Sequence, residues 1–150
     1  MIGQFANGHK RFDSNLHAEN DRKARSAGRK LFPRFGVEVR DNPDILGVDL
    51  FLLREGKIRA YAEGEVKHKG WMGTEFPWDN LHIPHRKEKI LQLNLSQVFF
   101  FVVNHLGNRV AVVRDENLRK CSVVEKFTEY TKELEPFFEI PMEYVKIHSI

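Results

Sequence analysis

Charged side chains alternate with apolar ones in YAEGEVKHK, residues 61–69, a stretch with the composition of a β-strand. Because alternate side chains of a strand share a face, Glu63, Glu65 and Lys67 point to one side. Sixteen residues before Glu65, Asp49 interrupts the apolar stretch ILGVDLFLL, where an isolated charge is costly. Such carboxylates can hold Mg²⁺, and a nearby lysine can orient water or stabilise developing negative charge. These residue types therefore suit metal-assisted phosphodiester hydrolysis.

Asp49 meets the other charged side chains only if the two strands pair in a suitable register. The sequence REGK between them predicts a hairpin turn, with Gly56 available for a positive φ. A two-residue loop at Glu55 and Gly56 by itself sends Asp49 to the opposite face of the sheet. We therefore predict an irregularity: a three-residue loop with a bulge at Gly56, or a bulge at Gly47 or Gly64.

Local patterns predict the elements that surround this hairpin. The segment that follows the N-cap candidates at 13–15 contains no proline before Pro33, and its apolar side chains gather on one side, which predicts an amphipathic helix. The expected elements are a helix at 14–32, strands at 36–39, 45–53, 57–69, 97–104, 107–115 and 142–147, a loop at 70–86 and a short helical turn at 87–93. Residues 116–142 show no decisive pattern.

Length and composition indicate one folded domain, residues 1–150. The chain is 41% hydrophobic and 30% charged, which is within the globular range. The order of elements predicts an α/β fold, a mixed central sheet with the N-terminal helix packed on it. Cys121 is the single cysteine, and no apolar run is long enough to span a bilayer, so we expect a cytoplasmic protein that does not contact a membrane.

Basic residues are concentrated near the N-terminus. Residues 1–35 contain eight Lys or Arg against three Asp or Glu, whereas the remainder has a small acidic excess. This asymmetry suggests a polyanionic partner, most often nucleic acid, and a solvated helix face is the alternative. The predicted nucleic-acid contacts are a flank of the helix and a basic run after the long loop: Arg22, Arg25, Arg29, Arg86 and Lys87.

Asp49 within an apolar strand, followed through a hairpin by Glu65-Val66-Lys67, resembles the signature of the PD-(D/E)XK nucleases, the restriction-endonuclease-like superfamily. The resemblance covers roughly residues 14–115 and implies a core of αβββ(α)β order. It also implies that Asp49, Glu65 and the Val66 carbonyl bind Mg²⁺, with Mn²⁺ as a substitute. Lys67 would then be the group that activates water or stabilises charge.

In Holliday-junction resolvases and some of their relatives, a glutamate on the first helix completes the metal site, and Glu19 matches that position. The resemblance thus implies a Mg²⁺-dependent DNA endonuclease, selective for junctions or branched DNA and acting as a homodimer. A catalytically inactive nucleic-acid-binding or adaptor module with the same fold is the alternative. Asp44 of the Pro43-Asp44 pair is the second candidate for the metal-binding aspartate, and Glu63 is a surplus acid.

Two further groups in the predicted loop have alternative interpretations. Trp71, Phe76 and Trp78 could stack on unpaired bases, although such aromatic residues more often cap a hydrophobic core. Pro84 separates His82 from His85 and disfavours a helical pair of zinc ligands. We therefore expect these residues to have structural roles.

Overall fold

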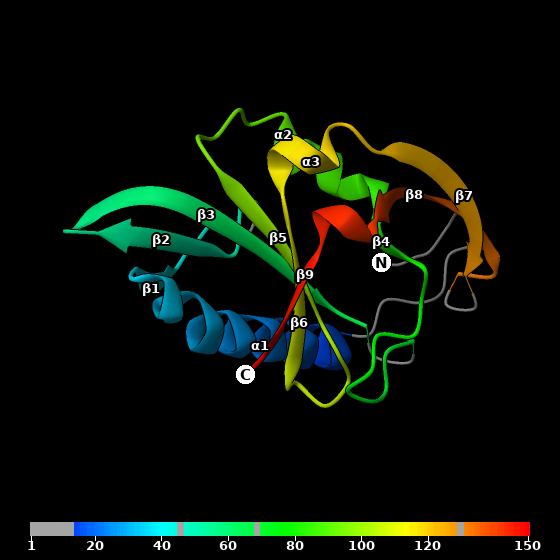
Figure 1. Ribbon diagram of the computed structural model, residues 1–150, viewed down its shortest axis with the longest axis horizontal. Coiled ribbons are helices and arrows are strands. Elements are labelled where there is room, and N and C mark those ends of the chain that lie inside the picture. The colour runs from blue at the N-terminus through cyan, green and yellow to red at the C-terminus, as the bar shows by residue number, and fades with distance from the viewer. Residues whose placement is uncertain (1–13, 45–46, 68–69, 129–130) are drawn as a thin grey trace.

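The protein contains a six-stranded sheet, a three-stranded sheet and a long N-terminal helix (Figure 1). The computed structural model describes residues 14–44, 47–67, 70–128 and 131–150. In chain order the elements are α1 (Ser14–Leu31), η1 (Phe32–Phe35), β1 (Glu38–Asp41), β2 (Leu50–Arg54), β3 (Lys57–Val66), β4 (Asn80–Pro84), η2 (His85–Lys87), α2 (Glu88–Leu91), β5 (Val98–Val103), β6 (Arg109–Arg114), α3 (Asp115–Leu118), β7 (Ser122–Thr128), β8 (Glu133–Pro141), η3 (Met142–Tyr144) and β9 (Lys146–Ser149).

The large sheet is mixed, with strand order β1-β2-β3-β5-β6-β9. β3 and β5 are parallel, and the other neighbouring strands are antiparallel. Five of the six residues of β5 are buried and Phe99 is partly exposed, as expected for an apolar strand near the centre of a sheet. The prediction of an α/β fold with a mixed central sheet and a packed N-terminal helix is confirmed.

The helix α1 packs on one face of the large sheet (Figure 1). Its buried side is made of small and aliphatic residues, since Ala24, Ala27 and Leu31 are nearly inaccessible to solvent. A side chain at Gly28 would come within 2.5 Å of Leu50, so the helix lies close to the strands. The helix ends before the 3₁₀ turn that contains Pro33, as the sequence predicts.

The hairpin of β2 and β3 has a two-residue loop. Arg54 pairs with Lys57, and both loop residues have positive φ, 52° at Glu55 and 76° at Gly56. Two such residues form the type I′ geometry, whose twist suits adjacent antiparallel strands. The predicted three-residue loop is therefore wrong.

A bulge in β3 supplies the predicted irregularity. Leu53 pairs with Ile58 and Leu52 pairs with Ala60, which leaves Arg59 as the extra residue. The alternatives at Gly47 and Gly64 are therefore also wrong. Ile58 and Arg59 are exposed near the hairpin tip, where an unpaired residue does not disturb a packed core.

The second sheet has strand order β4-β8-β7 and covers the other face of the large sheet. Its first strand, β4, lies inside the segment predicted to be a loop, so that prediction is wrong for residues 80–84. β4 pairs with β8, which lies within the segment without a decisive pattern. The expected strand at 142–147 is displaced, because η3 precedes β9. In the described part of the chain, no helix has the length and apolar character needed to cross a bilayer.

Gly64 marks a place where a side chain cannot be accommodated. A Cβ atom there would lie within 2.8 Å of three atoms of the buried Phe101 ring. We expect Gly64→Ala to lower the free energy of unfolding by about 1–3 kcal/mol in urea titrations, because the ring must shift within a packed core. Gly73→Ala is the control, since nothing lies within 4 Å of the added atom. Equal effects of the two substitutions would contradict this account.

Candidate active site

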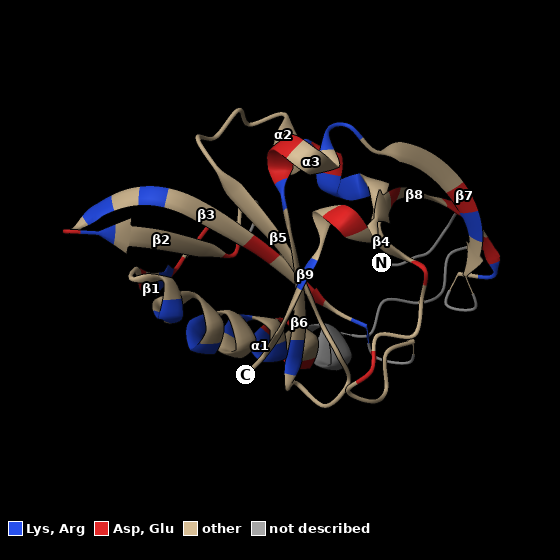
Figure 2. Cartoon of the chain, viewed as in Figure 1, with Lys and Arg blue, Asp and Glu red and all other residues tan. Residues whose placement is uncertain are grey.

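A cleft of about 330 Å³ lies where the first half of α1 meets the start of β2, the end of β3 and the η2-α2 segment. Basic residues recur along α1, and acidic residues stand on β3 (Figure 2). Four acidic and four basic residues line the cleft: Asp21, Asp49, Glu63, Glu65, Arg25, Arg86, Lys87 and Lys89.

Asp49 and Glu63 lie opposite each other at the cleft. Leu50, the first residue of β2, pairs with Ala62, so the preceding Asp49 comes opposite Glu63. The backbone N–H of Asp49 donates to Glu63 Oε1 at 3.1 Å, and the N–H of Gly64 donates to Asp49 Oδ2 at 2.9 Å. The bulge at Arg59 thus places Asp49 on the face predicted for it.

Arg25 holds Asp49 from the helix. Its Nη1 donates to the Asp49 carbonyl oxygen at 2.8 Å, and its Nη2 lies 3.5 Å from Asp49 Oδ1. Its Nε donates to Asp21 Oδ2 at 3.0 Å, and only 14% of the Arg25 side chain is exposed. Arg25 therefore positions an acidic residue, in contrast to the exposed helix flank predicted from the sequence.

Lys87 holds Glu63 from the other side of the cleft. Its Nζ lies 2.6 Å from Glu63 Oε2, with 12% of the lysine and 10% of the glutamate side chain exposed. The sequence suggested that Lys87 contacts phosphate. Its actual partner was not predictable because Lys87 follows β4, a strand that local patterns did not reveal.

Burial raises the pKa of both carboxyl groups. Burial raises the pKa of Asp49 above its ordinary value, against the lowering effects of the Gly64 N–H and the charges of Lys87 and Arg25. Burial also raises the pKa of Glu63, and the nearby Asp49 charge acts in the same direction while Lys87 opposes it. The cleft therefore holds protons more tightly than a surface pair of carboxylates does.

Glu65 lines the same cleft as Asp49, and Val66 does as well. Glu65 Oε1 is buried without a hydrogen-bond partner, and Lys67 Nζ lies 3.8 Å from it. Lys67 is not among the residues that line the cleft, and its Nζ lies 5.6 Å from the centre of the Phe137 ring. The structure thus brings Asp49 and Glu65 to one cleft. Lys67 contacts Glu65 but does not line the cleft.

Asn20, and not Glu19, is the residue of α1 that lies where the helix glutamate was expected. Glu19 is exposed and lies outside the cleft lining, whereas Asn20 lines the cleft and its Oδ1 is buried without a hydrogen-bond partner. Asn20 precedes the buried Ala24 by four residues and therefore shares its face of the helix. That spacing could have identified Asn20 from the sequence. Asp44 is exposed and is also outside the lining.

The other predicted phosphate contacts differ in their surroundings. Arg86 is exposed at the cleft, and Arg22 is exposed on α1. Arg29 Nη1 lies 2.5 Å from Asp41 Oδ1, so its charge is partly neutralised. Lys89, which belongs to the same basic run in the sequence, is exposed beside Arg86 in the lining. The basic rim of the cleft therefore comes mainly from the segment after β4.

The cleft offers oxygen donors suited to a hard divalent cation. Besides the carboxylates of Asp49 and Glu63, it has side-chain oxygens of Asn20 and Glu65 that accept no hydrogen bond, although Lys67 Nζ lies 3.8 Å from the Glu65 oxygen. Within the described ranges, no three His, Cys, Asp or Glu residues form a ready cage for a metal ion. Mg²⁺ usually has only one or two protein carboxylates and completes its octahedron with water and substrate phosphate. The oxygen ligands of the cleft therefore fit a Mg²⁺ ion that also binds water and substrate phosphate.

Comparisons of the chain with models of protein families, with curated proteins and with solved structures found no match.

Proposed function

We propose that the protein is a Mg²⁺-dependent DNA endonuclease of the PD-(D/E)XK type. The observation that carries this proposal is the convergence of Asp49, Glu63 and Glu65 in one cleft with exposed basic residues at its edge. Carboxylates suit a catalytic cation, and exposed arginine and lysine side chains suit the phosphates of the substrate. Mn²⁺ would serve as a substitute for Mg²⁺.

In this proposal Asp49 and Glu65 bind the metal, together with the carbonyl of Val66 and the side chain of Asn20. When bound, the metal supplies charge neutralisation and lowers the pKa of a coordinated water. Arg25 keeps Asp49 in position through its carbonyl and carboxylate oxygens. Lys67 remains the candidate for orienting the water beside Glu65.

Glu63 and Lys87 give the proposed site a second charged pair. Because the ammonium group of Lys87 already lies within the cleft, it is placed to stabilise negative charge on a phosphate that enters there. Glu63 is placed to fix both Lys87 and the backbone of Asp49. We assign Glu63 a positioning role and Lys87 a phosphate-stabilising role.

The proposed substrate is junction or branched DNA, and the proposed assembly is a homodimer, because paired cuts need two sites. We place the activity in the cytoplasm. The test is incubation of purified protein with duplex, single-stranded and four-way-junction DNA in Mg²⁺, in Mn²⁺ and in EDTA. We expect cleavage that requires the metal and is fastest on branched DNA. Failure to cut any of these DNAs in either metal would refute the enzymatic proposal.

One observation favours a second candidate, a DNA-binding module without catalysis. Lys87 lies on Glu63 and Arg25 lies on Asp49, so protein cations already neutralise both buried acids. Calorimetric titration with Mn²⁺ separates the candidates. Uptake of one ion by the wild type and none by Asp49→Asn supports the nuclease, whereas absence of uptake by either protein supports the module.

The affinity for metal should begin to fall at a higher pH than it would at a site made of exposed carboxyl groups. Burial raises the pKa of Asp49 and of Glu63, so protons compete with the metal at a higher pH than at an exposed acid. We expect Mn²⁺ affinity to fall as the pH is lowered from about 8 to about 5, and to fall less steeply in Glu63→Gln. Glu75→Gln, at an exposed position outside the cleft, should match the wild type. A flat profile for the wild type would contradict the assignment.

A further inference from the structure

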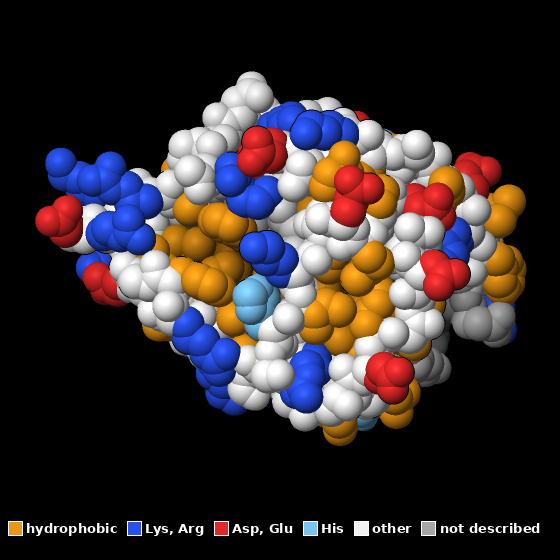
Figure 3. Space-filling model, viewed as in Figure 1, with side chains coloured by type: hydrophobic (Ala, Val, Ile, Leu, Met, Phe, Trp, Pro, Cys, Tyr) orange, Lys and Arg blue, Asp and Glu red, His pale blue; other side chains and the backbone are white. Residues whose placement is uncertain are grey.

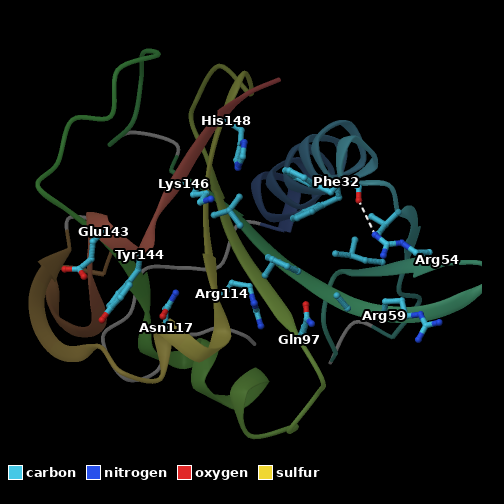
Figure 4. Close-up of a pocket in the computed structure, with 16 residues that line it drawn as sticks. Phe32, Arg54, Arg59, Gln97, Arg114, Asn117, Glu143, Tyr144, Lys146 and His148 are labelled. Atoms are coloured by element: carbon cyan, nitrogen blue, oxygen red, sulfur yellow. Dashed lines mark hydrogen bonds between the residues drawn. The ribbon is translucent and has the colours of Figure 1, made fainter.

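A larger groove of about 940 Å³ lies on the α1 face of the large sheet, beyond the end of the helix. It is bounded by η1, the β2-β3 hairpin, β5, β6 and β9 (Figure 4). Hydrophobic side chains show in a hollow of this face, with basic side chains around it (Figure 3). The cleft with the carboxylates shares no lining residue with this groove.

The groove presents aromatic rings over an aliphatic floor. Leu52 and Ala60 are buried beneath it. Phe35 is 51% exposed, and its ring stands edge-on to that of His148 at 5.6 Å between centroids. Phe99 and Tyr144 are partly exposed in the same lining. Several accessible rings along one groove are suited to stacking with flat partners.

Basic residues surround these rings. Arg54 and Arg59 are on the hairpin side and Lys146 is on the β9 side, beside His148, whose pKa is lowered by burial and by neighbouring cations, which favours the neutral ring (Figure 4). Glu143 is the acidic residue among those that line the groove. The groove therefore combines accessible rings with an excess of basic over acidic side chains.

Two of the arginines have partners within the protein. Arg54 donates to the carbonyl oxygen of Phe35 at 3.3 Å and so supports the turn that carries this ring. The Arg114 guanidinium lies 5.5 Å from the centre of the Phe99 ring, and its Nη1 lies 3.1 Å from Glu116. Arg59 and Lys146 are exposed, which makes them the best placed cations for an external anion.

We propose that this groove binds a single-stranded segment of DNA, with a base stacked on Phe35 and phosphates near Arg59 and Lys146. Rings interleaved with cations match the two features that single strands present, flat bases and a charged backbone. A second copy of the same groove would oppose like charges, which disfavours self-association through this face. An acidic amphipathic peptide is the alternative ligand, although it lacks a row of flat bases. The test below distinguishes peptide binding from oligonucleotide binding.

The proposal rests on the proposed function and specifies its substrate as DNA in which a single strand adjoins a duplex. Groove and cleft use the same strand, with Arg59 and Ala60 at the groove and Glu63 and Glu65 at the cleft. At about 3.3 Å per residue, these positions lie roughly 10–20 Å apart along β3. Because Ala60 and Glu63 point to opposite faces of β3, one branched DNA would reach both sites by passing around the edge of the sheet.

Binding can be tested without cleavage, by fluorescence anisotropy in EDTA with a labelled oligothymidylate of about 12 nucleotides. We expect Phe35→Ala to weaken binding about tenfold, since a stacked base is lost. Phe127→Ala is the matched control, because Phe127 is 56% exposed on β7 of the other sheet. Thermal unfolding of each variant establishes that it is folded.

Charge substitutions give a second readout that does not require a change in the hydrophobic groove. Arg59→Ala should weaken binding and reduce the slope of log K against log salt by about 0.7, as expected for one lost contact to a single-strand phosphate. Lys30→Ala, at an exposed position on α1 outside the groove, should leave the slope unchanged.

The groove proposal is overturned if the wild type does not bind the oligonucleotide, or if Phe35→Ala and Arg59→Ala both bind like the wild type. It is equally overturned if an acidic amphipathic peptide binds in a Phe35-dependent way and the oligonucleotide does not. Groove-dependent binding without any cleavage in Mg²⁺ would reject the nuclease proposal alone. If Phe35→Ala and Arg59→Ala lose oligonucleotide binding but still cleave branched DNA at the wild-type rate, the groove does not contribute to substrate selection.

Discussion

Asp49→Asn should lower the rate of DNA cleavage at saturating Mg²⁺ by about a thousandfold or more. The amide has lost the negative charge that a divalent cation requires, and the metal contributes several kcal/mol of transition-state stabilisation. The substitution keeps the size of the side chain, and an amide oxygen can still accept the Gly64 N–H. Single-turnover cleavage of a labelled four-way junction measures the effect.

The same variant should retain DNA binding in EDTA, since no phosphate contact is assigned to Asp49. Asp79→Asn is the matched control, because Asp79 is exposed just before β4 and lies outside the cleft. We expect its rate to equal that of the wild type. Wild-type cleavage by Asp49→Asn would show that this aspartate does not bind the catalytic metal.

Glu65→Gln and Glu63→Gln distinguish the two glutamates. If Glu65 is a metal ligand, as proposed from its place in the cleft and its oxygen that accepts no hydrogen bond, its amide variant should lose Mn²⁺ uptake together with cleavage. If Glu63 only positions Lys87 and the Asp49 backbone, its amide variant should retain Mn²⁺ uptake. The reverse result would move the metal site two residues along β3, to the position directly opposite Asp49.

Lys87→Met should lower the free energy of unfolding by about 3–5 kcal/mol near neutral pH. The methionine fills much of the same space but leaves the carboxylate of Glu63 buried without its cation. Urea titration in EDTA measures this loss. Lys57→Met, at an exposed position near the hairpin tip, is the control and should have little effect.

The loss should depend on pH in a defined direction. Burial already raises the pKa of Glu63, and removal of Lys87 raises it further. A carboxyl group with a raised pKa in the folded protein binds its proton more tightly there than in the unfolded chain, so stability falls as the pH rises through that window. Lys87→Met should therefore be less destabilised at about pH 5 than at about pH 8.

The double variant Glu63→Gln with Lys87→Met supplies the remaining control. It removes both charges, so it should recover much of the stability lost in Lys87→Met. If the double variant is as unstable as the single one, packing around the lysine stem is responsible for the loss. Equal destabilisation at both pH values would lead to the same conclusion.

Local sequence patterns were sufficient for the elements that carry the acids. The proline-free helix, the apolar run of β5 and the turn at Gly56 are each determined by neighbours in sequence. The need for a bulge could also be predicted, because alternation allows only two faces. The position of the bulge at Arg59 could not, since any exposed residue of the hairpin could take that place equally well.

The parts that could not be predicted depend on contacts between distant segments. β4 becomes a strand by pairing with β8, more than fifty residues later, and Lys87 reaches Glu63 only because that pairing fixes η2. Trp71, which the sequence left open as a base-stacking residue, has no exposed surface and belongs to the core. The accessible ring of Phe35 lies instead in a turn that carried no such signal.

The surplus residue at Arg59 has a consequence for how this fold can vary. Register between β2 and β3 changes there, so the outer end of the hairpin is uncoupled from the half that bears Asp49 and Glu63. Selection can therefore alter the length of this arm, for example to reach a different target, while the inner half keeps its alignment. The bulge therefore separates the outer part of the hairpin, whose length can change, from the inner part, where the alignment of Asp49 with Glu63 must be kept.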